Sequence, residues 1–239
     1  MPDHAGALFQ VASQFNLLEM TGPNVTPEDG VTRYAHDHTQ GPACAIAAGA
    51  ATLYRNYFTP IDNHSGQTRD RQIDCLLEVG TALGNADGSL WTMRNGYALC
   101  TQAGLARIDS ALAAKSDDDL DALRAQLRIG LHWDVEVTDM HGPTHRVSQA
   151  FCSALPVAYT RVPAQHWARF ATLILEASYE ATLWAGVINA RERGSRLVCL
   201  THVGGGAFGN LETWIHAAQR RALDKFARAD LDVRLVSFG

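Results

Sequence analysis

The stretch RLVCLTHVGGGAFGNLETWIHAAQRRALDKFARADLDVRLVSF, residues 196–238, decides the fold. Its first residues, 196–203, form an apolar run that predicts a buried strand, and the glycine-rich segment 204–210 follows directly. An amphipathic pattern predicts a helix at 211–228, and residues 233–238 predict a final strand. Strand, loop, helix and strand together make a βαβ unit, whose strands run parallel with a right-handed crossover. The C-terminal part of the chain therefore predicts an α/β fold.

Further strands are predicted before this unit. The run LFQVASQFNLL at 8–18 interleaves apolar and polar residues as a strand does. From 127 to 137 every second residue is apolar, which predicts a half-buried strand. The segment DMHGPTH at 139–145 predicts a turn, and 146–159 an antiparallel partner. Residues 89–100 predict either two short strands around an Asn-Gly turn or one strand that enters a helix.

Helices are predicted at 41–53, 70–82 and 101–126, and a long helix is predicted to begin at Pro163. The acidic run at 117–119 indicates a loop or a helix start. In the long helix, apolar residues recur at alternating spacings of three and four, which predicts a stripe that packs against the core. This stripe comprises Trp167, Phe170, Ile174, Ala177, Ala181, Trp184 and Ile188. We interpret it as core packing and not as a cofactor site.

The composition is that of a globular protein. The 239 residues are 46% hydrophobic and 19% charged, without repeats or low-complexity linkers, so we expect one mixed α/β domain over 1–239. The net charge of −5 argues against a general nucleic-acid-binding surface. No apolar run approaches the ~20 residues needed to cross a bilayer, so no membrane partner is expected.

The cysteines and the first residues bear on the cellular compartment. The start, MPDHAGALF, lacks the basic and apolar regions of a signal peptide. Five scattered cysteines, an odd number with no CxxC spacing, predict free thiols and not disulfides or a zinc site. They are Cys44, Cys75, Cys100, Cys152 and Cys199. We therefore expect a cytoplasmic protein.

The glycine-rich loop VGGGAFGN is the strongest local signal for a binding site. Its glycines allow backbone amides to approach a ligand, and the following helix N-terminus favours an anion. The alternative is a plain tight turn with Asn210 as the helix N-cap. Four glycines within 204–209 exceed what a turn needs, which favours the anion-binding loop. The spacing fits neither the dinucleotide fingerprint nor the loop of nucleoside triphosphatases.

A second signal is the long loop 19–42, which breaks all periodicity and carries several acids. Long loops inside compact domains are usually functional. Asp29 and Asp37 are eight positions apart, so both carboxylates can reach one small volume, and Glu28 directly precedes Asp29. Taken alone, each of these acids is more often an ordinary loop residue than a site residue, and it is their occurrence as a set that indicates a site. The His-Asp-His run at 36–38 also allows a metal site, although adjacent residues rarely contact one ion.

Polar residues at the end of the first predicted strand complete the candidate site. Gln14, Asn16 and Glu19 can hydrogen-bond a base or a ribose, or else satisfy the backbone of the long loop itself. No nucleophile signature is present, and Cys44 has no compelling histidine partner in the sequence.

Five blocks of sequence together resemble the macrodomain superfamily of ADP-ribose binders and ADP-ribosyl hydrolases. The blocks are ASQFN at 12–16, TPEDG at 26–30, QGPACA at 40–45, SALPVAY at 153–159 and VGGGAFGN at 203–210. They are similar to a bacterial branch associated with removal of ADP-ribose from arginine, and the resemblance spans 8–239. It implies a three-layer α/β/α fold with a mixed central sheet.

The resemblance also implies that two loops, 41–44 and 204–210, grip the pyrophosphate from opposite sides. Two departures from the family pattern are present. SQFN at 13–16 replaces an NAAN stretch, and Gly-Pro-Ala at 41–43 replaces three glycines. Pro42 has no N–H to donate, so neighbouring amides must bind instead. The expected ADP-ribose-binding residues are Gln14, Asn16, Glu19, Gly41, Ala43, Cys44, Gly204, Gly205, Gly206, Ala207, Phe208, Gly209 and Asn210.

The expected function is hydrolysis of an ADP-ribosyl bond to a protein side chain, with arginine as the expected acceptor. Such a reaction needs a carboxylate that orients or activates water, and Glu28, Asp29 and Asp37 are the candidates. The expected partner is ADP-ribose or an ADP-ribosylated protein, with no cofactor and no metal. Two alternatives remain: a non-catalytic ADP-ribose reader, and a metal-dependent hydrolase that uses the loop 29–38.

Overall fold

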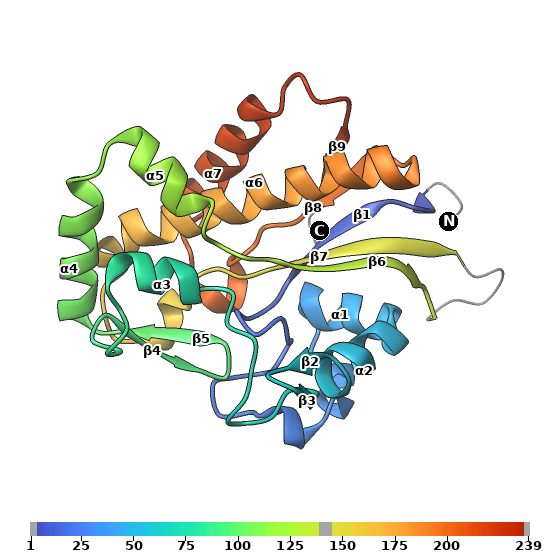
Figure 1. Cartoon of the computed structure of the whole chain (residues 1–239), viewed down its shortest axis with the longest axis horizontal. Helices are drawn as coiled ribbons and strands as arrows, with labels where there is room; N and C mark the ends of the chain where they lie inside the picture. The colour runs from blue at the N-terminus through green and yellow to red at the C-terminus, as the bar shows by residue number, and fades with distance from the viewer. Residues whose placement is uncertain (1–3, 139–144, 237–239) are drawn as a thin grey trace.

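The computed structural model describes residues 4–138 and 145–236 (Figure 1). Its centre is a five-stranded sheet with strand order β6-β7-β1-β8-β9. These strands are β1 (Leu8–Ala12), β6 (Gly130–Glu136), β7 (Arg146–Cys152), β8 (Leu197–Leu200) and β9 (Asp232–Leu235). β7, β1, β8 and β9 run parallel, and β6 is antiparallel to β7. The central sheet is therefore mixed, as predicted.

Helices cover both faces of this sheet (Figure 1). On one face, α1 (Gln40–Ala47) lies against β1 and α2 (Gly49–Tyr57) against β6. On the other face, α6 (Ala168–Arg193) crosses β1, β7 and β8 and packs against α7 (Glu212–Lys225). The predicted three-layer α/β/α arrangement is confirmed.

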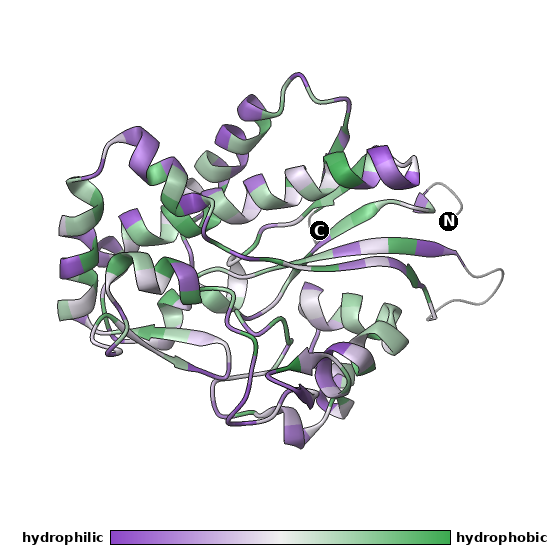
Figure 2. Ribbon diagram, in the orientation of Figure 1, coloured by the Kyte–Doolittle hydropathy of each residue, from purple (hydrophilic) through white to green (hydrophobic). Residues whose placement is uncertain are grey.

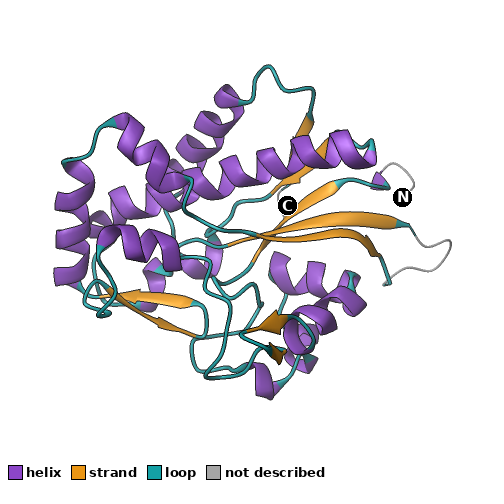
Figure 3. Ribbon diagram, viewed as in Figure 1, coloured by secondary structure: helices purple, strands orange, loops and turns teal. Residues whose placement is uncertain are grey.

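The other elements lie beside this sandwich and are drawn in Figure 3. The helices are α3 (Leu77–Leu83), α4 (Gln102–Ala113) and α5 (Asp117–Arg124), and the short strands are β2 (Pro60–Ile61), β3 (His64–Ser65), β4 (Trp91–Arg94) and β5 (Tyr97–Cys100). The 3-10 helices are η2 (Pro27–Asp29), η3 (Thr32–His36), η4 (Val157–Tyr159), η5 (Ala164–Trp167) and η6 (Gly206–Phe208).

These elements confirm one local prediction and decide between the two alternatives left open for 89–100. β4 and β5 form an antiparallel hairpin whose turn residues, Asn95 and Gly96, both have positive φ angles, of 46° and 77°. The Asn-Gly signal at 89–100 therefore marks a hairpin. β8, α7 and β9 form the predicted βαβ unit with parallel strands.

β1 ends at Ala12, earlier than the strand predicted at 8–18. The chain leaves the sheet there because Leu17 adopts a left-handed φ of 66° and Gln14 bonds to the backbone of Met20. The residues from 13 to 18 are nonetheless all buried. The sequence pattern reflects their burial and not their pairing in the sheet.

The helix predicted at 41–53 is two helices, α1 and α2, divided at Ala48. Thr138 lies at the division: its N–H donates to the carbonyl of Ala47 at 2.8 Å, and its hydroxyl accepts from Gly49 N–H at 3.2 Å. A local sequence pattern contains no trace of such a distant contact. The helix predicted at 70–82 is likewise shorter, because α3 begins only at Leu77.

The strand predicted at 127–137 corresponds to β6, but its regular alternation is interrupted. The register with β7 shifts between His132 and Val135, and Asp134 between them has a φ of 52°. This irregularity rotates the strand and leaves its apolar side chains only partly buried. β7 is the predicted antiparallel partner, and the turn predicted at 139–145 lies almost entirely outside the described residues.

The prediction that the apolar stripe of the long helix packs against the core is correct only for the first half of the helix. Trp167, Phe170 and Ile174 are buried, whereas Trp184 is 54% exposed and Ile188 is 39% exposed. A spacing that averages 3.5 residues drifts about 20° per heptad on a helix of 3.6 residues per turn, so the stripe rotates off the core over three heptads. In the second half of α6 the face of Gly186 meets the sheet instead: a Cβ there would lie 2.6 Å from Val198.

Trp184 contributes little to stability by this geometry. Its ring lies edge-on to Phe226, with centroids 4.9 Å apart, on the outside of the helical layer. We expect Trp184→Ala to lower the free energy of unfolding by only ~1 kcal/mol, the size of one aromatic pair. Urea denaturation measures this, and a loss of ~3–5 kcal/mol would show that the side chain is buried after all.

The core lies on both sides of the sheet, and its hydropathy is visible in Figure 2. β1 is predominantly green there, while the C-terminal end of α6 is purple. The largest fully buried side chains include Phe15, Phe151, Trp167, Phe170 and Tyr179. Within the described ranges, no helix combines the length and apolar character needed to span a membrane.

Candidate functional site

A cavity of about 600 Å³ opens at the carboxyl ends of the parallel strands. Its wall includes residues 12–14 at the end of β1, Ala154 after β7 and 201–208 after β8, together with 37–42 at the start of α1. Open α/β sheets bind ligands at this end of their strands. Both loops singled out in the sequence therefore contribute to one concave site.

Helix α1 begins in close contact with the end of β1. The side-chain amide of Gln40 accepts from Ala12 N–H and donates to Gln10 carbonyl, both at 2.9 Å, and so extends the hydrogen bonding of the strand. Gly41 follows, and a Cβ there would lie only 2.1 Å from the carbonyl oxygen of Ala12. Glycine is required at this position, because only glycine lets the first turn of α1 reach the cavity.

Asp37 stabilises the chain just before α1. Its Oδ1 accepts hydrogen bonds from the N–H of Thr39 at 2.8 Å and from the Thr39 hydroxyl at 2.6 Å. This local turn holds the carboxylate on the cavity wall, with His38 beside it. Of the three acids predicted to be catalytic, Asp37 is the one that lines the cavity.

Glu28 and Asp29 are placed differently. The Glu28 carboxylate accepts from the N–H of Arg69 at 2.8 Å and 3.1 Å. Asp29 accepts from the N–H of Thr26 at 2.8 Å, and this hydrogen bond lowers the pKa of its carboxyl group. Neither residue lines the cavity, so both acids serve the conformation of the long loop.

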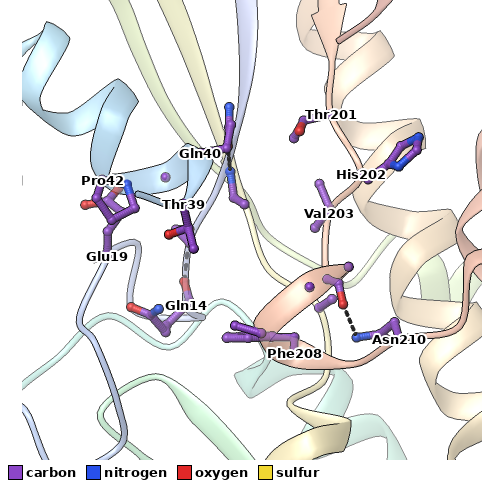
Figure 4. A pocket seen from close by; sticks show the side chains of 18 of the residues that line it. Gln14, Glu19, Thr39, Gln40, Pro42, Thr201, His202, Val203, Phe208 and Asn210 are labelled. Carbon is purple, nitrogen blue, oxygen red and sulfur yellow. Dashed lines mark hydrogen bonds between the residues drawn. The ribbon is translucent and has the colours of Figure 1, made fainter. Parts of the chain in front are cut away.

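The glycine-rich loop forms the facing wall of the cavity (Figure 4). Gly204, Gly206 and Gly209 have φ angles of 78°, 57° and 71°, a conformation that other residues rarely adopt. Between them lies the single turn η6. The amides of a first helical turn have no partner within the helix, so those of 206–208 are available to an anion.

Two contacts fix the shape of this loop. The Asn210 side-chain amide donates to the carbonyls of Leu155 at 2.8 Å and Gly204 at 3.0 Å. A Cβ at Gly209 would lie 2.8 Å from the Cβ of Ala158. Asn210 is therefore not the helix N-cap, because α7 begins later and is preceded by Leu211. Its side chain fastens the loop to the chain after β7.

Three aromatic rings stand together on the cavity wall. Tyr97, Tyr159 and Phe208 have ring centroids 5.0–5.6 Å apart in all three pairs. The Tyr97 hydroxyl donates to the carbonyl of Met20 at 2.9 Å. Burial and Tyr159 raise the pKa of Tyr97, and the negative charge of Asp37 adds to the shift. The Asp37 carboxylate is thus close enough to Tyr97 for the two groups to interact electrostatically.

Glu19 lies in the cavity wall but is held by a buried ion pair. Both of its carboxylate oxygens accept from Nη2 of Arg55, at 2.8 Å and 2.9 Å, and each residue is only 2% exposed. Burial raises the pKa of Glu19, and the Arg55 guanidinium opposes that shift. The guanidinium also lies over the ring of Phe151, 3.9 Å from its centroid.

The remaining predicted contacts divide between wall and interior. Gln14 lines the cavity, with its amide engaged by the backbone of Met20, whereas the amide of Asn16 bonds to Gln72 and Leu18 away from it. Ala43 and Cys44, one turn into α1, do not line the cavity. Burial raises the pKa of the Cys44 thiol to about 12, so it is a poor nucleophile at neutral pH.

The sequence did not single out several wall residues. Thr39, Tyr97, Thr201 and His202 line the cavity from three different segments. The Asp-x-Thr pattern at 37–39 is a recognisable turn signal, but the others come together only through the fold.

The charges on the cavity wall indicate how an anion would bind. The ionisable side chains of the wall include Asp37, His38, His202 and Glu212, and no lysine or arginine is among the described residues that form it. An anion would therefore depend on backbone amides. No group of three His, Cys, Asp or Glu side chains suited to a metal ion occurs in the part of the chain that the structure describes.

Comparison with known proteins gives no match: no family model, no curated protein and no solved structure is significantly similar to this chain. The α/β/α fold and the cavity are therefore the basis for any functional conclusion.

Proposed function

We propose that this chain is an ADP-ribosyl hydrolase that removes ADP-ribose from a protein side chain, with arginine as the acceptor. The observation that carries the proposal is the pair of backbone donor sets on opposite sides of one cavity: the first turn of α1 at 40–41 and the turn η6 at 206–208. Two sets of amides suit the two phosphates of a diphosphate. A cavity of about 600 Å³ is also of the size usual for small-molecule sites.

In the proposed reaction, Asp37 holds the attacking water. The water oxygen bonds to C1″ of the distal ribose while the bond from C1″ to the guanidine nitrogen breaks. The carboxylate takes a proton from the water and returns it to the departing guanidine, which leaves as a guanidinium group. The products are free ADP-ribose and unmodified arginine. The rings of Tyr159 and Phe208, which are partly exposed and pack on the buried ring of Tyr97, offer faces on which a planar cation can lie.

The second candidate is a reader that binds ADP-ribose without cleaving it. It is favoured by the positions of Glu28 and Asp29, which leave Asp37 as the single predicted catalytic acid on the wall. In addition, Oδ1 of Asp37 already accepts two hydrogen bonds from Thr39.

A calorimetric titration with ADP-ribose tests both candidates. We expect saturable binding by the parent protein and at least ~10-fold weaker binding by Gly205→Val, equivalent to ~1.4 kcal/mol. The physical reason is space: even a Cβ at Gly205 would lie 3.3 Å from the carbonyl oxygen of His202, so valine must shift the loop. Unchanged affinity in a folded variant would place the diphosphate elsewhere, and absence of binding by the parent would reject both candidates.

Release of ADP-ribose from an arginine-modified protein then separates the two. A hydrolase releases ADP-ribose with turnover, whereas a reader binds the modified protein and releases none.

A further inference from the structure

One buried hydroxyl group joins three segments beneath the glycine-rich loop. Tyr179 of α6 is fully buried, and its Oη donates to the carbonyl of Thr201 at 2.7 Å. The same oxygen accepts from the N–H of Val203 at 3.1 Å and from the side-chain amide of Gln219 at 3.2 Å. All the hydrogen-bonding capacity of a phenol is used here.

These contacts hold a segment that the sheet does not hold, because β8 ends at Leu200 and the backbone after it is not part of a strand. Thr201 and Val203 are the residues through which the chain passes from β8 into the loop, and both line the cavity. Thr201 N–H donates in turn to the side chain of Gln10 at 3.2 Å. Side chains from β1 and α6 thus replace the sheet in holding this backbone.

Gln219 extends the connection to the other end of the loop. It lies on α7, the helix that begins immediately after the loop, and it is buried. The residues that enter the loop, Thr201 and Val203, and the helix that follows it are therefore all hydrogen-bonded to the same atom, Oη of Tyr179. The amides of 206–208 are therefore set by a group that does not itself line the cavity.

We propose that Tyr179 is a positioning residue for the anion-binding loop: its hydroxyl fixes the bend at 201–203 and thereby the direction of the η6 amides. The inference deepens the proposed function, on which its ligand depends. Binding groups must be held within about 0.5 Å of their productive positions, so loss of the hydroxyl must weaken diphosphate binding without removing any contact to the ligand.

Tyr179→Phe tests this, since it removes one oxygen and keeps the ring in the core. We expect at least ~10-fold weaker ADP-ribose binding by calorimetry. The matched control is Asn189→Ala on the same helix. Asn189 is equally buried and makes three hydrogen bonds, with Gly6, Ser195 and Ser148, away from the cavity. The control is expected to lose stability but to keep its affinity. Equal affinity of Tyr179→Phe and the parent would overturn the proposal, as would an equal loss of affinity in the control.

Amide hydrogen exchange gives a readout that does not require a ligand. In Tyr179→Phe, exchange of the Val203 and Gly205 amides is expected to accelerate, while that of the amides near Asn189 stays unchanged. If the parent protein fails to bind ADP-ribose but Tyr179→Phe shows this local acceleration, the proposed function is rejected and the positioning role is retained. Unaltered exchange would reject the positioning role itself. Should Tyr179→Phe not fold, Gln219→Leu removes one of the three hydrogen bonds, and a smaller loss of affinity in the same direction is expected.

Discussion

Asp37→Ala is expected to slow the release of ADP-ribose from an arginine-modified protein by about 100-fold or more, the scale on which an acid–base group contributes. Asp37 is the predicted catalytic acid on the cavity wall, and it is held there by Thr39. The measurement is the single-turnover rate at saturating enzyme, because the same carboxylate can also contact a ribose hydroxyl and affect binding. Thermal stability should change little, since Asp37 is partly exposed and its hydrogen bonds reach only Thr39, two residues along the chain.

Asp29→Ala is the matched control for this experiment. It removes the same group from the same loop, but Asp29 bonds to Thr26 and does not line the cavity. We expect its rate to remain much closer to that of the parent. Full activity of Asp37→Ala, or an equal loss in both variants, would remove Asp37 from the role of base. Loss of the parent's activity in chelator would favour the metal-dependent alternative instead.

The fold could be predicted well from the sequence wherever local patterns decide it. The βαβ unit depends on neighbours in sequence and was predicted correctly, and the Asn-Gly hairpin was one of the two alternatives predicted for 89–100. The errors arise where remote contacts intervene. Thr138 divides the helix predicted at 41–53, and Gly186 turns the second half of α6 toward the sheet in place of Trp184. Neither contact leaves a local signal.

The candidate site shows the same division. The glycines at 204–209 and the Gly-Pro helix start indicated the two walls, because glycine and proline directly restrict or permit particular backbone conformations. The roles of the acids could not be deduced in this way. Glu28, Asp29 and Asp37 are similar in sequence context, and only the folded loop brings Asp37 alone to the cavity. The same holds for Glu19, whose partner Arg55 is 36 positions away.

Arg55→Met is expected to lower the free energy of unfolding by about 3–5 kcal/mol, because it leaves the buried carboxylate of Glu19 without its partner. The arginine also donates from Nε to the carbonyl of Leu17 at 2.6 Å. The pKa of His132 is lowered to about 4, mainly by burial of the imidazole and to a smaller extent by the positive charge of Arg55. Methionine fills the space of the aliphatic stem of Arg55 but replaces neither the ion pair with Glu19 nor the hydrogen bond to Leu17. Urea denaturation measures the loss, and a variant as stable as the parent would show that the pair contributes nothing.

The pH dependence of the stability of Arg55→Met tests whether the unpaired carboxylate of Glu19 causes the loss. Without Arg55, the attraction that opposes desolvation disappears, so the pKa of Glu19 in the folded variant rises further above its value in the unfolded chain. A group with a raised pKa in the folded state stabilises most below its unfolded pKa and loses that contribution as the pH rises through the folded value. Arg55→Met should therefore be closer to the parent at pH 5 than at pH 8. Adding Glu19→Gln removes the Glu19 carboxyl group, so the double variant should lose the part of this pH dependence that Glu19 causes, keep the part due to His132, and recover part of the stability at pH 8. A double variant less stable than Arg55→Met at pH 8 would mean that the guanidinium acts mainly through Leu17 and Phe151, and not through the charge of Glu19.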